Sequence, residues 1–220
     1  MTPQERGRDI PVATVSRLPD YLRALAGFAA RGISSLSSDM LATAVGVRST
    51  QLRKDLSHLG SHGVRGVGYD VARLTSEIGN VLGLTRSYPV VIVGMGNLGR
   101  ALAAYSGFSS EGFSVAALAD RDPGLVGESI GGTVVSGMPD LPALVRRLGL
   151  AVGVVATPPA SAQDAVDALV AAGVDAILNF APAAVAVPDG VIVRRVDLAT
   201  ELHVLAFLHE HRIDGVEAAG

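Results

Sequence analysis

Hydrophobic residues recur at steps of three and four positions through the first part of the chain. This spacing predicts an amphipathic helix over about residues 12–31, whose apolar stripe consists of Val15, Leu18, Leu22, Leu25 and Phe28. A short helix is expected from Ser38 to Val45, and another from Ser49, its expected N-cap, to a stop at Gly60. Two helices joined by a tight glycine turn are typical of a helix-turn-helix.

The second of these paired helices is apolar on one face and polar on the other. Leu52, Leu56 and Leu59 share the apolar face. The polar face could contact DNA, because Arg and Lys suit guanine edges or phosphates and Gln suits an adenine edge. The candidate DNA-binding residues on this helix are Ser49, Thr50, Gln51, Arg53, Lys54 and Ser57. The alternative is an ordinary helical hairpin with a solvated basic face.

A glycine-rich loop follows this helix. The stretch GSHGVRGVGYD places four glycines around Arg65, which is typical of a tight hairpin that carries one cation. A wing of this form makes Arg65 a further candidate for contact with DNA. A helix capped by Asp70 and buried through Val71, Leu74, Ile78 and Leu82 then closes the domain. We therefore expect a winged-helix DNA-binding domain over residues 1–86.

From about residue 90 the pattern changes to short, continuous apolar runs. They occupy residues 90–94, 113–119, 151–156, 174–179 and 191–193. Runs of this kind are typical of strands that are covered on both faces of a parallel sheet. The sequence therefore predicts an α/β fold over residues 87–196, a Rossmann-like doubly wound parallel sheet of five to seven strands.

A glycine motif follows the first of these strands and precedes an Ala- and Leu-rich helix. In IVGMGNLGRALAAY the glycines are spaced as Gly-x-Gly-x-x-Gly, which lays a pyrophosphate on backbone N–H groups at a helix N-terminus. The candidate cofactor-binding residues of this loop are Gly94, Met95, Gly96, Asn97, Leu98 and Gly99. A dinucleotide is expected here, with a purely structural glycine turn as the alternative.

The ends of the later strands supply further candidates for the same crevice. Asp120 ends the next strand at the distance expected for a carboxylate that binds a ribose, which favours NAD(H), although the neighbouring Arg121 would suit a 2′-phosphate. Ligands of open α/β sheets bind beyond the carboxyl ends of strands. The remaining candidates at such ends are Thr157, Pro158, Asn179 and Phe180.

Composition limits the class of protein. The 220 residues are 49% hydrophobic and include no cysteine, which predicts a globular, soluble and cytoplasmic protein without thiolate metal sites. No apolar run reaches about 18 residues, and the polar start MTPQERGRD lacks a signal-peptide core, so no membrane span or export is expected.

The charge is divided unevenly along the chain. Residues 1–86 carry ten Arg and one Lys against seven acidic residues, whereas residues 87–220 carry seven Arg against fourteen acidic residues. A basic first part indicates contact with nucleic acid, with a solvated charged surface as the alternative.

Groups that could transfer a hydride are missing from the expected places. None of the four tyrosines is followed four residues later by lysine, and none of the five histidines lies at a strand end. His209 and His211 would point to different sides of a helix, so no metal site is expected. We therefore expect no catalytic residue and no enzyme. An NAD-dependent oxidoreductase that lacks its partner and a CoA-binding module remain as alternatives.

Four segments resemble the Rex family of redox-sensing transcriptional repressors, particularly its actinobacterial members. In order they are LRKDLSHLGSHGVRGVGYDV, VVIVGMGNLGRALAAYSGF, ILNFAP and VRRVDLATEL, within a resemblance that extends from about residue 10 to 212. The resemblance implies a winged-helix domain joined to a Rossmann domain, and a homodimer that binds a palindromic operator. It also implies that NAD+ permits this binding and that NADH disrupts it, so the cofactors NADH and NAD+ would act as signals.

The resemblance further implies a redox switch formed by Arg23, Tyr105 and Asp197. Asp197 would pair with Arg23 across the dimer in the DNA-competent form and with the Tyr105 hydroxyl in the NADH form. From the residues alone, Arg23 could equally be a solvated helix residue, Tyr105 a core aromatic and Asp197 the N-cap of the final helix.

The C-terminal segment, residues 197–220, is expected to form a helix that is exchanged in the dimer. From Leu202 to Leu208 only His203 is polar, so this helix is apolar nearly all round and favours burial on several sides. Packing on its own domain is the alternative.

Overall fold

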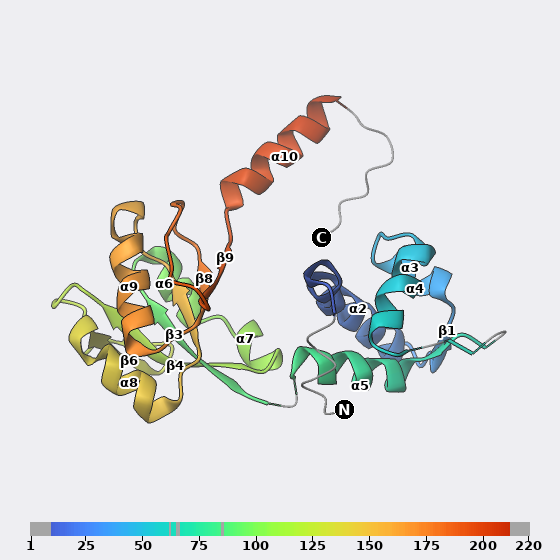
Figure 1. The fold of residues 1–220 in the computed structure, drawn as a ribbon, viewed down its shortest axis with the longest axis horizontal. Helices are drawn as coiled ribbons and strands as arrows, with labels where there is room; N and C mark the ends of the chain where they lie inside the picture. Colours follow the sequence, from blue (N-terminus) through green and yellow to red (C-terminus); the bar gives the residue numbers. More distant parts are fainter. Residues whose placement is uncertain (1–9, 62, 65–66, 85, 212–220) are drawn as a thin grey trace. The chain divides into compact units, whose positions relative to one another are not determined.

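The computed structural model describes residues 10–61, 63–64, 67–84 and 86–211. The chain divides into two compact units, and the division falls between residues 85 and 86. Figure 1 shows a largely helical first unit and a second unit built around a sheet.

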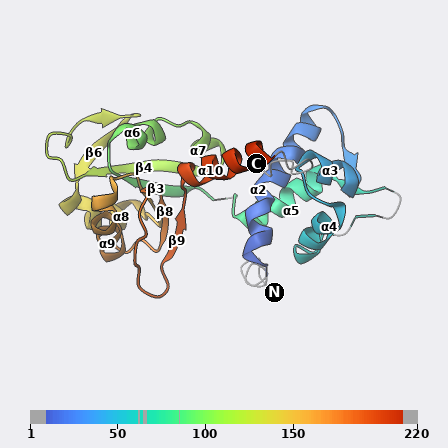
Figure 2. The same ribbon diagram turned by 90° about the horizontal axis from the view of Figure 1, so that it is seen from above.

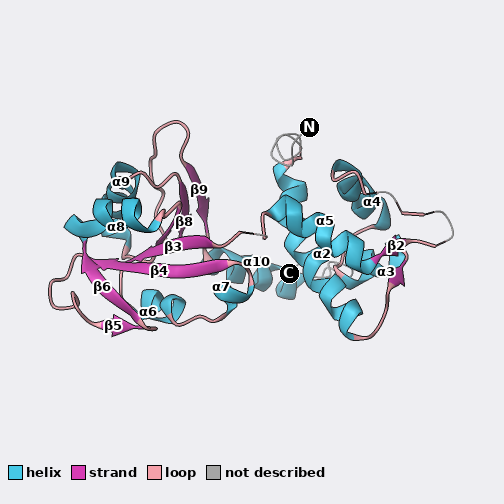
Figure 3. Ribbon diagram, turned by 90° about the horizontal axis from the view of Figure 1, so that it is seen from below, coloured by secondary structure: helices cyan, strands magenta, loops and turns pink. Residues whose placement is uncertain are grey.

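The first unit contains four helices among its described residues, and two very short strands, β1 (Ser35–Leu36) and β2 (Tyr69–Asp70), which pair antiparallel. The helices are α2 (Val12–Ala30), α3 (Ser38–Ala44), α4 (Ser49–His58) and α5 (Val71–Leu82). Figure 3 distinguishes them by secondary structure. Their core is formed by fully buried side chains from all four helices, among them Leu18, Leu25, Leu41, Leu52, Leu56, Leu74 and Ile78. The expected helix-turn-helix is therefore present as α3 and α4.

The helix caps agree with the sequence at one position and differ at another. Asp70 caps α5 as expected, because its carboxylate accepts a hydrogen bond from the Arg73 N–H at 2.8 Å. The expectation that Ser49 caps α4 is wrong. Ser49 is the first residue of the helix, and Arg48 takes the extended backbone conformation of the cap, with φ −75° and ψ 140°. Its side chain makes no capping hydrogen bond.

The buried face of α2 also differs from the apolar stripe that the sequence predicts. Leu18, Leu25 and Phe28 are buried as expected, but Thr14 and Tyr21 are buried as well. Both hydroxyl groups point to a carboxylate of α4, described below. Thr14 and Tyr21 are therefore buried because each has a polar partner in α4, which the hydrophobic pattern of α2 does not reveal.

The second unit is built on a sheet of seven strands in the order β5-β6-β4-β3-β7-β8-β9. All neighbouring strands are parallel except β5 and β6, which pair antiparallel. The strands are β3 (Tyr88–Val93), β4 (Phe113–Asp120), β5 (Ser129–Ile130), β6 (Thr133–Gly137), β7 (Val152–Val155), β8 (Ala176–Asn179) and β9 (Ile192–Arg195). The predicted Rossmann-like doubly wound sheet is confirmed.

Helices cover both faces of this sheet. Figure 2 shows α8 (Leu141–Leu148) and α9 (Ala162–Ala172) on one side and α6 (Asn97–Ala103) on the other. Successive residues of β3 belong to the hydrophobic cores on opposite faces of the sheet. Val91 packs on the side of α8 and α9, and Ile92 packs on the side of α6. Two-sided burial explains why the strands read as continuous apolar runs.

The remaining α-helices of this unit are the short α7 (Gly107–Ser110) and α10 (Leu198–His211), which follows β9. Two 3-10 helices, η2 (Met138–Asp140) and η3 (Pro159–Ser161), directly precede α8 and α9. None of the side chains of α10 is buried. Large apolar residues on it stay exposed, including Leu202 at 64% and Phe207 at 53%.

Candidate functional site

The three glycines of the loop between β3 and α6 differ in their surroundings. Two of them have no room for a side chain, and the third faces open space. Gly94 has φ +99°, and a Cβ there would lie 2.8 Å from the Thr157 side chain and 2.9 Å from the Ala156 backbone. A Cβ on Gly99 would lie 1.8 Å from the Gly94 carbonyl oxygen. Gly96 is different, because its φ is −69° and a Cβ would meet no described atom within 4 Å. Packing therefore requires Gly94 and Gly99, whereas Gly96 keeps space free in front of the loop.

The other loop residues divide between packing and exposure. The Met95 side chain is buried in the core on the α6 side of the sheet. Asn97 and Leu98 begin α6 and are exposed. Arg100, one turn further along α6, donates from Nε to the Met95 carbonyl oxygen at 3.1 Å and from Nη2 to Glu128 at 2.7 Å. These contacts of Arg100, which hold the glycine loop, were not predicted from the sequence, because Glu128 lies in a segment without a motif.

Asp120 ties the end of β4 to the glycine loop. Its Oδ2 accepts from the Met95 N–H at 2.5 Å, and its Oδ1 accepts from the Asp122 N–H at 2.8 Å. A carboxylate oxygen has two lone pairs, so each oxygen can still accept a hydrogen bond from a ligand. The position that the sequence predicts for a ribose-binding acid is thus at the loop, and the carboxylate also orders that loop.

A cavity of about 320 Å³ lies at the carboxyl ends of β3, β4, β6 and β7. Its walls combine a polar set with apolar residues. The polar set is Asp120, Arg121, Thr157, Ser161 and Asp164; the others include Gly94, Gly96, Met138 and Pro158. Among the described residues, Thr157 Oγ1 is the one buried side-chain polar atom without a hydrogen-bond partner. A buried hydroxyl without a partner in a cavity wall is available to a ligand.

Two of the predicted strand-end residues lie elsewhere. Asn179 is buried at the end of β8 and uses its amide within its own loop, donating to the Ala183 carbonyl oxygen at 3.1 Å and accepting from the Ala181 N–H at 2.9 Å. Phe180 packs against the core on the α6 side. Neither residue lines the cavity, whereas Thr157 and Pro158 do.

The outer face of α4 carries the predicted DNA-binding side chains. Thr50, Arg53, Lys54 and Ser57 are exposed. Arg53 Nη1 donates to Ser38 Oγ of α3 at 3.4 Å, and the Ser57 hydroxyl donates to the Lys54 carbonyl oxygen at 2.6 Å. Ser49 is half-buried at the start of the helix. Arg65 lies outside the described residues. Val64 and Gly68, which are described, form an isolated antiparallel bridge.

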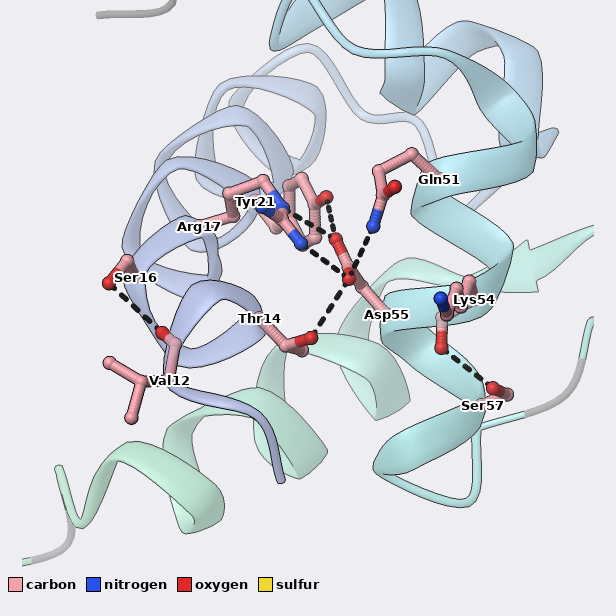
Figure 4. Close-up of polar contacts among 9 residues, drawn as sticks. All are labelled: Val12, Thr14, Ser16, Arg17, Tyr21, Gln51, Lys54, Asp55 and Ser57. Atoms are coloured by element: carbon pink, nitrogen blue, oxygen red, sulfur yellow. Dashed lines mark hydrogen bonds and ion pairs between the residues drawn. The ribbon is translucent and has the colours of Figure 1, made fainter. Parts of the chain in front are cut away.

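The inner face of α4 holds a buried carboxylate that sequence reasoning missed. Figure 4 shows Asp55 at the centre of a cluster of polar side chains from α2 and α4. Its two oxygens accept hydrogen bonds at 2.7–3.0 Å from Thr14 Oγ1, Arg17 Nε and Nη2, Tyr21 Oη and Gln51 Nε2. The sequence does hold one sign of this carboxylate, because Asp55 lies within the apolar spacing of Leu52, Leu56 and Leu59.

The hydrogen bonds decide the charge of Asp55. Burial acts to raise the pKa of Asp55, but the donors of Arg17, Tyr21, Thr14 and Gln51 outweigh this effect and lower the pKa to about 2. Burial, together with the bond to Asp55, raises the pKa of the Tyr21 hydroxyl, so it remains a donor. Asp55 is therefore an ionised, acceptor-only group inside the helical unit.

The three predicted switch residues have local partners in the single chain. Arg23 pairs with Asp20 on the same helix at 3.0 Å. Asp197 pairs with Arg195 and accepts from the Ala199 and Thr200 N–H groups at 3.1 and 3.3 Å, which is the geometry of an N-cap of α10. Tyr105 is 59% exposed and packs edge-on against Phe108. In one chain, Arg23 is thus a solvated helix residue and Asp197 is the N-cap of the final helix, as the alternatives from the sequence describe them.

Comparisons with known proteins place this arrangement in a family. Residues 9–57 match a family model described as a putative DNA-binding protein N-terminus, and residues 85–183 match a CoA binding domain. The redox-sensing transcriptional repressor Rex of Streptomyces coelicolor is 55% identical over 99% of this chain and 84% of its own length. The chain belongs to the Rex family. The Rex protein of Carboxydothermus hydrogenoformans is 46% identical over 92% of this chain and 97% of its own length.

Solved Rex structures agree with both units. RSP, a Rex-family repressor solved in complex with beta-NAD+ and operator DNA, matches with a TM-score of 0.86 and 33% identity over 95% of this chain and 99% of its own. RSP in complex with beta-NADH matches with a TM-score of 0.83 and 31% identity over the same shares. The resemblance that the sequence motifs indicate is confirmed, and this member of the family is a regulator rather than an enzyme.

The described residues lack two further features. In the part of the chain that the structure describes, no helix combines the length and apolar character needed to cross a membrane. The same residues include no group of three or more His, Asp or Glu side chains placed to hold a metal ion.

Proposed function

We propose that this protein is a transcriptional repressor that binds a palindromic operator as a homodimer, with NAD+ permitting the binding and NADH releasing the DNA. The observation that carries the proposal is the similarity over nearly the full chain to RSP, solved with beta-NAD+ and operator DNA and also with beta-NADH. A repressor of this kind acts on chromosomal DNA, so we place it in the cytoplasm.

The dinucleotide is proposed to bind along the glycine loop. The space in front of Gly96 admits the pyrophosphate, and Asp120 accepts hydrogen bonds from the adenosine ribose. Thr157 Oγ1 provides a free hydroxyl in the same cavity. The titratable residues that line the described cavity are Asp120, Arg121 and Asp164.

The operator is proposed to contact the outer face of α4. Thr50, Arg53, Lys54 and Ser57 are available there, and Arg65 in the wing would add a phosphate contact. The unit that carries these residues is also the basic part of the chain.

The dimer is proposed to form through α10. Large apolar side chains on this helix are exposed in one chain, and their burial by a second copy would stabilise an assembly. The ion pairs of Arg23 with Asp20 and of Asp197 with Arg195 are both exposed or partly exposed, so they cost little to exchange for a pair across the dimer.

The test is a titration of operator binding with NADH and with NAD+ in separate experiments. We expect NADH to release the DNA at concentrations at which NAD+ does not, with no turnover of NADH by alcohols or acids. Coenzyme A is the control ligand, because residues 85–183 match a CoA binding domain. Release by coenzyme A but not by NADH would contradict the proposal, as would equal release by NADH and NAD+.

A further inference from the structure

The amide of Gln51 is held in one orientation by the buried carboxylate of Asp55. Gln51 and Asp55 are one turn apart on α4, and Gln51 Nε2 donates to Asp55 Oδ1 at 2.9 Å. Gln51 is half-buried, at the border between the face that packs on α2 and the face that carries Arg53 and Lys54. Figure 4 shows the amide nitrogen turned toward the carboxylate.

The reverse orientation of this amide is excluded by charge. Asp55 is ionised, so both of its oxygens can only accept hydrogen bonds. A flipped amide would set the Gln51 oxygen against a carboxylate oxygen, which is repulsive. Because α2 supplies four other hydrogen bonds to Asp55, the carboxylate itself cannot turn away to accommodate a flipped amide.

The remaining atoms of the amide are left for a partner outside the helix. Gln51 Oε1 accepts no hydrogen bond from the described residues and is not among their buried polar atoms without a partner, so it reaches solvent. One N–H of the amide is directed to Asp55, which leaves the other N–H for a further acceptor. A Gln side chain with this oxygen and this N–H free matches adenine, whose N6 donates and whose N7 accepts in the major groove.

We propose that Asp55 is a positioning residue for base recognition, which fixes the Gln51 amide so that α4 selects adenine over guanine at one operator position. Guanine presents two acceptors, O6 and N7, at the same place, and Gln51 Oε1 would face O6 in a repulsive contact. Guanine would be suited by an amide turned so that both N–H groups of Nε2 face O6 and N7, and Asp55 prevents this because it holds one of these N–H groups. This inference rests on the proposed DNA binding and concerns one base position within it.

The experiment selects bound duplexes from a pool with a randomised centre, using the full chain without NADH. Duplexes that differ from the selected sequence at a single base pair are then compared for affinity. Wild-type protein should prefer adenine to guanine at one position in each half-site by about 5- to 150-fold, the range of a bidentate contact. Gln51→Met, which removes the amide and leaves the α2 bonds to Asp55 in place, should abolish that preference and keep the preferences at other positions.

Asp55→Asn tests the orientation itself. An asparagine can donate as well as accept, so it permits the flipped Gln51 amide, and the adenine-to-guanine ratio should fall at the same position. Tyr21→Phe is the matched control, because it removes a hydrogen bond to the other oxygen of Asp55 and leaves Gln51 paired. It should lower stability and leave the ratio unchanged. Gln163→Met is the control for the substitution, since Gln163 makes the same bond to Asp167 on α9 of the other unit.

The outcomes separate the two proposals. If wild-type protein selects no sequence from the pool, the proposed function fails. If it selects a sequence and Gln51→Met retains every base preference, the role of Gln51 is refuted while the function stands. An Asp55→Asn protein that folds and keeps the full adenine preference overturns the role of Asp55. If Asp55→Asn does not fold, the comparison of Gln51→Met with Tyr21→Phe decides, because equal loss of the preference in both would mark a structural effect only.

Discussion

The glycines at positions 96 and 99 look equivalent in the motif and are not equivalent in the structure. A side chain at position 99 collides with the Gly94 carbonyl oxygen, whereas one at position 96 enters the space in front of the loop. The conformation of Gly96 is also open to other residues, since its φ is negative. Stability and ligand binding are therefore separable at these two positions.

Gly96→Val should abolish binding of both NADH and NAD+ while changing the free energy of unfolding by less than about 1 kcal/mol. The valine occupies the approach of the pyrophosphate to the loop. Gly99→Val should destabilise the second unit instead. Thermal unfolding and NADH fluorescence titration measure the two effects. A Gly96→Val protein that binds NADH normally would show that the dinucleotide lies elsewhere.

The Asp55 cluster makes the stability of the first unit depend on pH in acid. The pKa of Asp55 is lowered from 3.8 to about 2, so its ionised form favours the folded state. The stabilisation is complete above about pH 4 and is lost as the pH falls through the window from about 4 to about 2. A shift of this size corresponds to about 2 kcal/mol.

We expect the difference in unfolding free energy between wild type and Asp55→Asn to shrink by about this amount between pH 4 and pH 2. Urea unfolding, followed by circular dichroism, measures it. Asp39→Asn, at an exposed acid of α3, is the control and should show a much smaller change. A difference that is constant with pH would mean that folding does not lower the pKa of Asp55.

At the scale of elements, substitution of the exposed cations of α4 distinguishes contacts with base edges from contacts with phosphates. Arg53→Ala and Lys54→Ala should each weaken operator binding by about 1 to 3 kcal/mol if the residue contacts a base edge, whereas loss of a phosphate contact reduces the salt dependence by about one unit. NADH affinity should not change. Arg147→Ala on α8 removes the same charge from the other unit and is the control. Unchanged operator affinity in both variants would remove α4 as the DNA-binding helix.

Much of the fold follows from local pattern, and the exceptions have physical causes. The helices α2 to α5 and the strands β3, β4, β7, β8 and β9 lie where periodicity and apolar runs predict them. The strands β5 and β6 were missed because they are short and flank the Gly131-Gly132 turn, without a continuous apolar run. Sequence spacing does not reveal a partner on another element.

The same limit applies to the site. The glycine loop, Asp120 and Thr157 are predictable, because a motif or a strand end marks them. Asp55 is not, since its burial depends on three side chains of α2 that are about 40 residues away in the chain. Asn179 shows the opposite case, in which a polar residue at a strand end serves its own loop.

At the scale of the whole molecule, the redox switch that we propose brings together groups from both units in the dimer. Arg23 belongs to the first unit and Asp197 to the second. Arg23→Ala should weaken operator binding, because it removes the pair proposed for the DNA-competent form. Tyr105→Phe should leave operator binding intact and reduce release by NADH.

A double-mutant cycle between Arg23 and Asp197, measured on operator affinity, decides whether the two residues interact. We expect a coupling energy of about 0.5 to 3 kcal/mol. The pair Arg31 and Asp197 is the control and should be additive. Additivity for Arg23 and Asp197 as well would mean that they never meet, and each would keep the local partner that it has in the single chain.

The outer strands of the sheet bear on how copies of the protein can associate. One edge is β5, which has only two residues, and the other is β9, which ends on Arg194 and Arg195. Very short strands and charged side chains at an edge discourage the addition of a strand from another chain. The dimer that we propose, which rearranges with the redox state, is thereby kept from locking into a continuous intermolecular sheet, and its proposed association through α10 can shift and release.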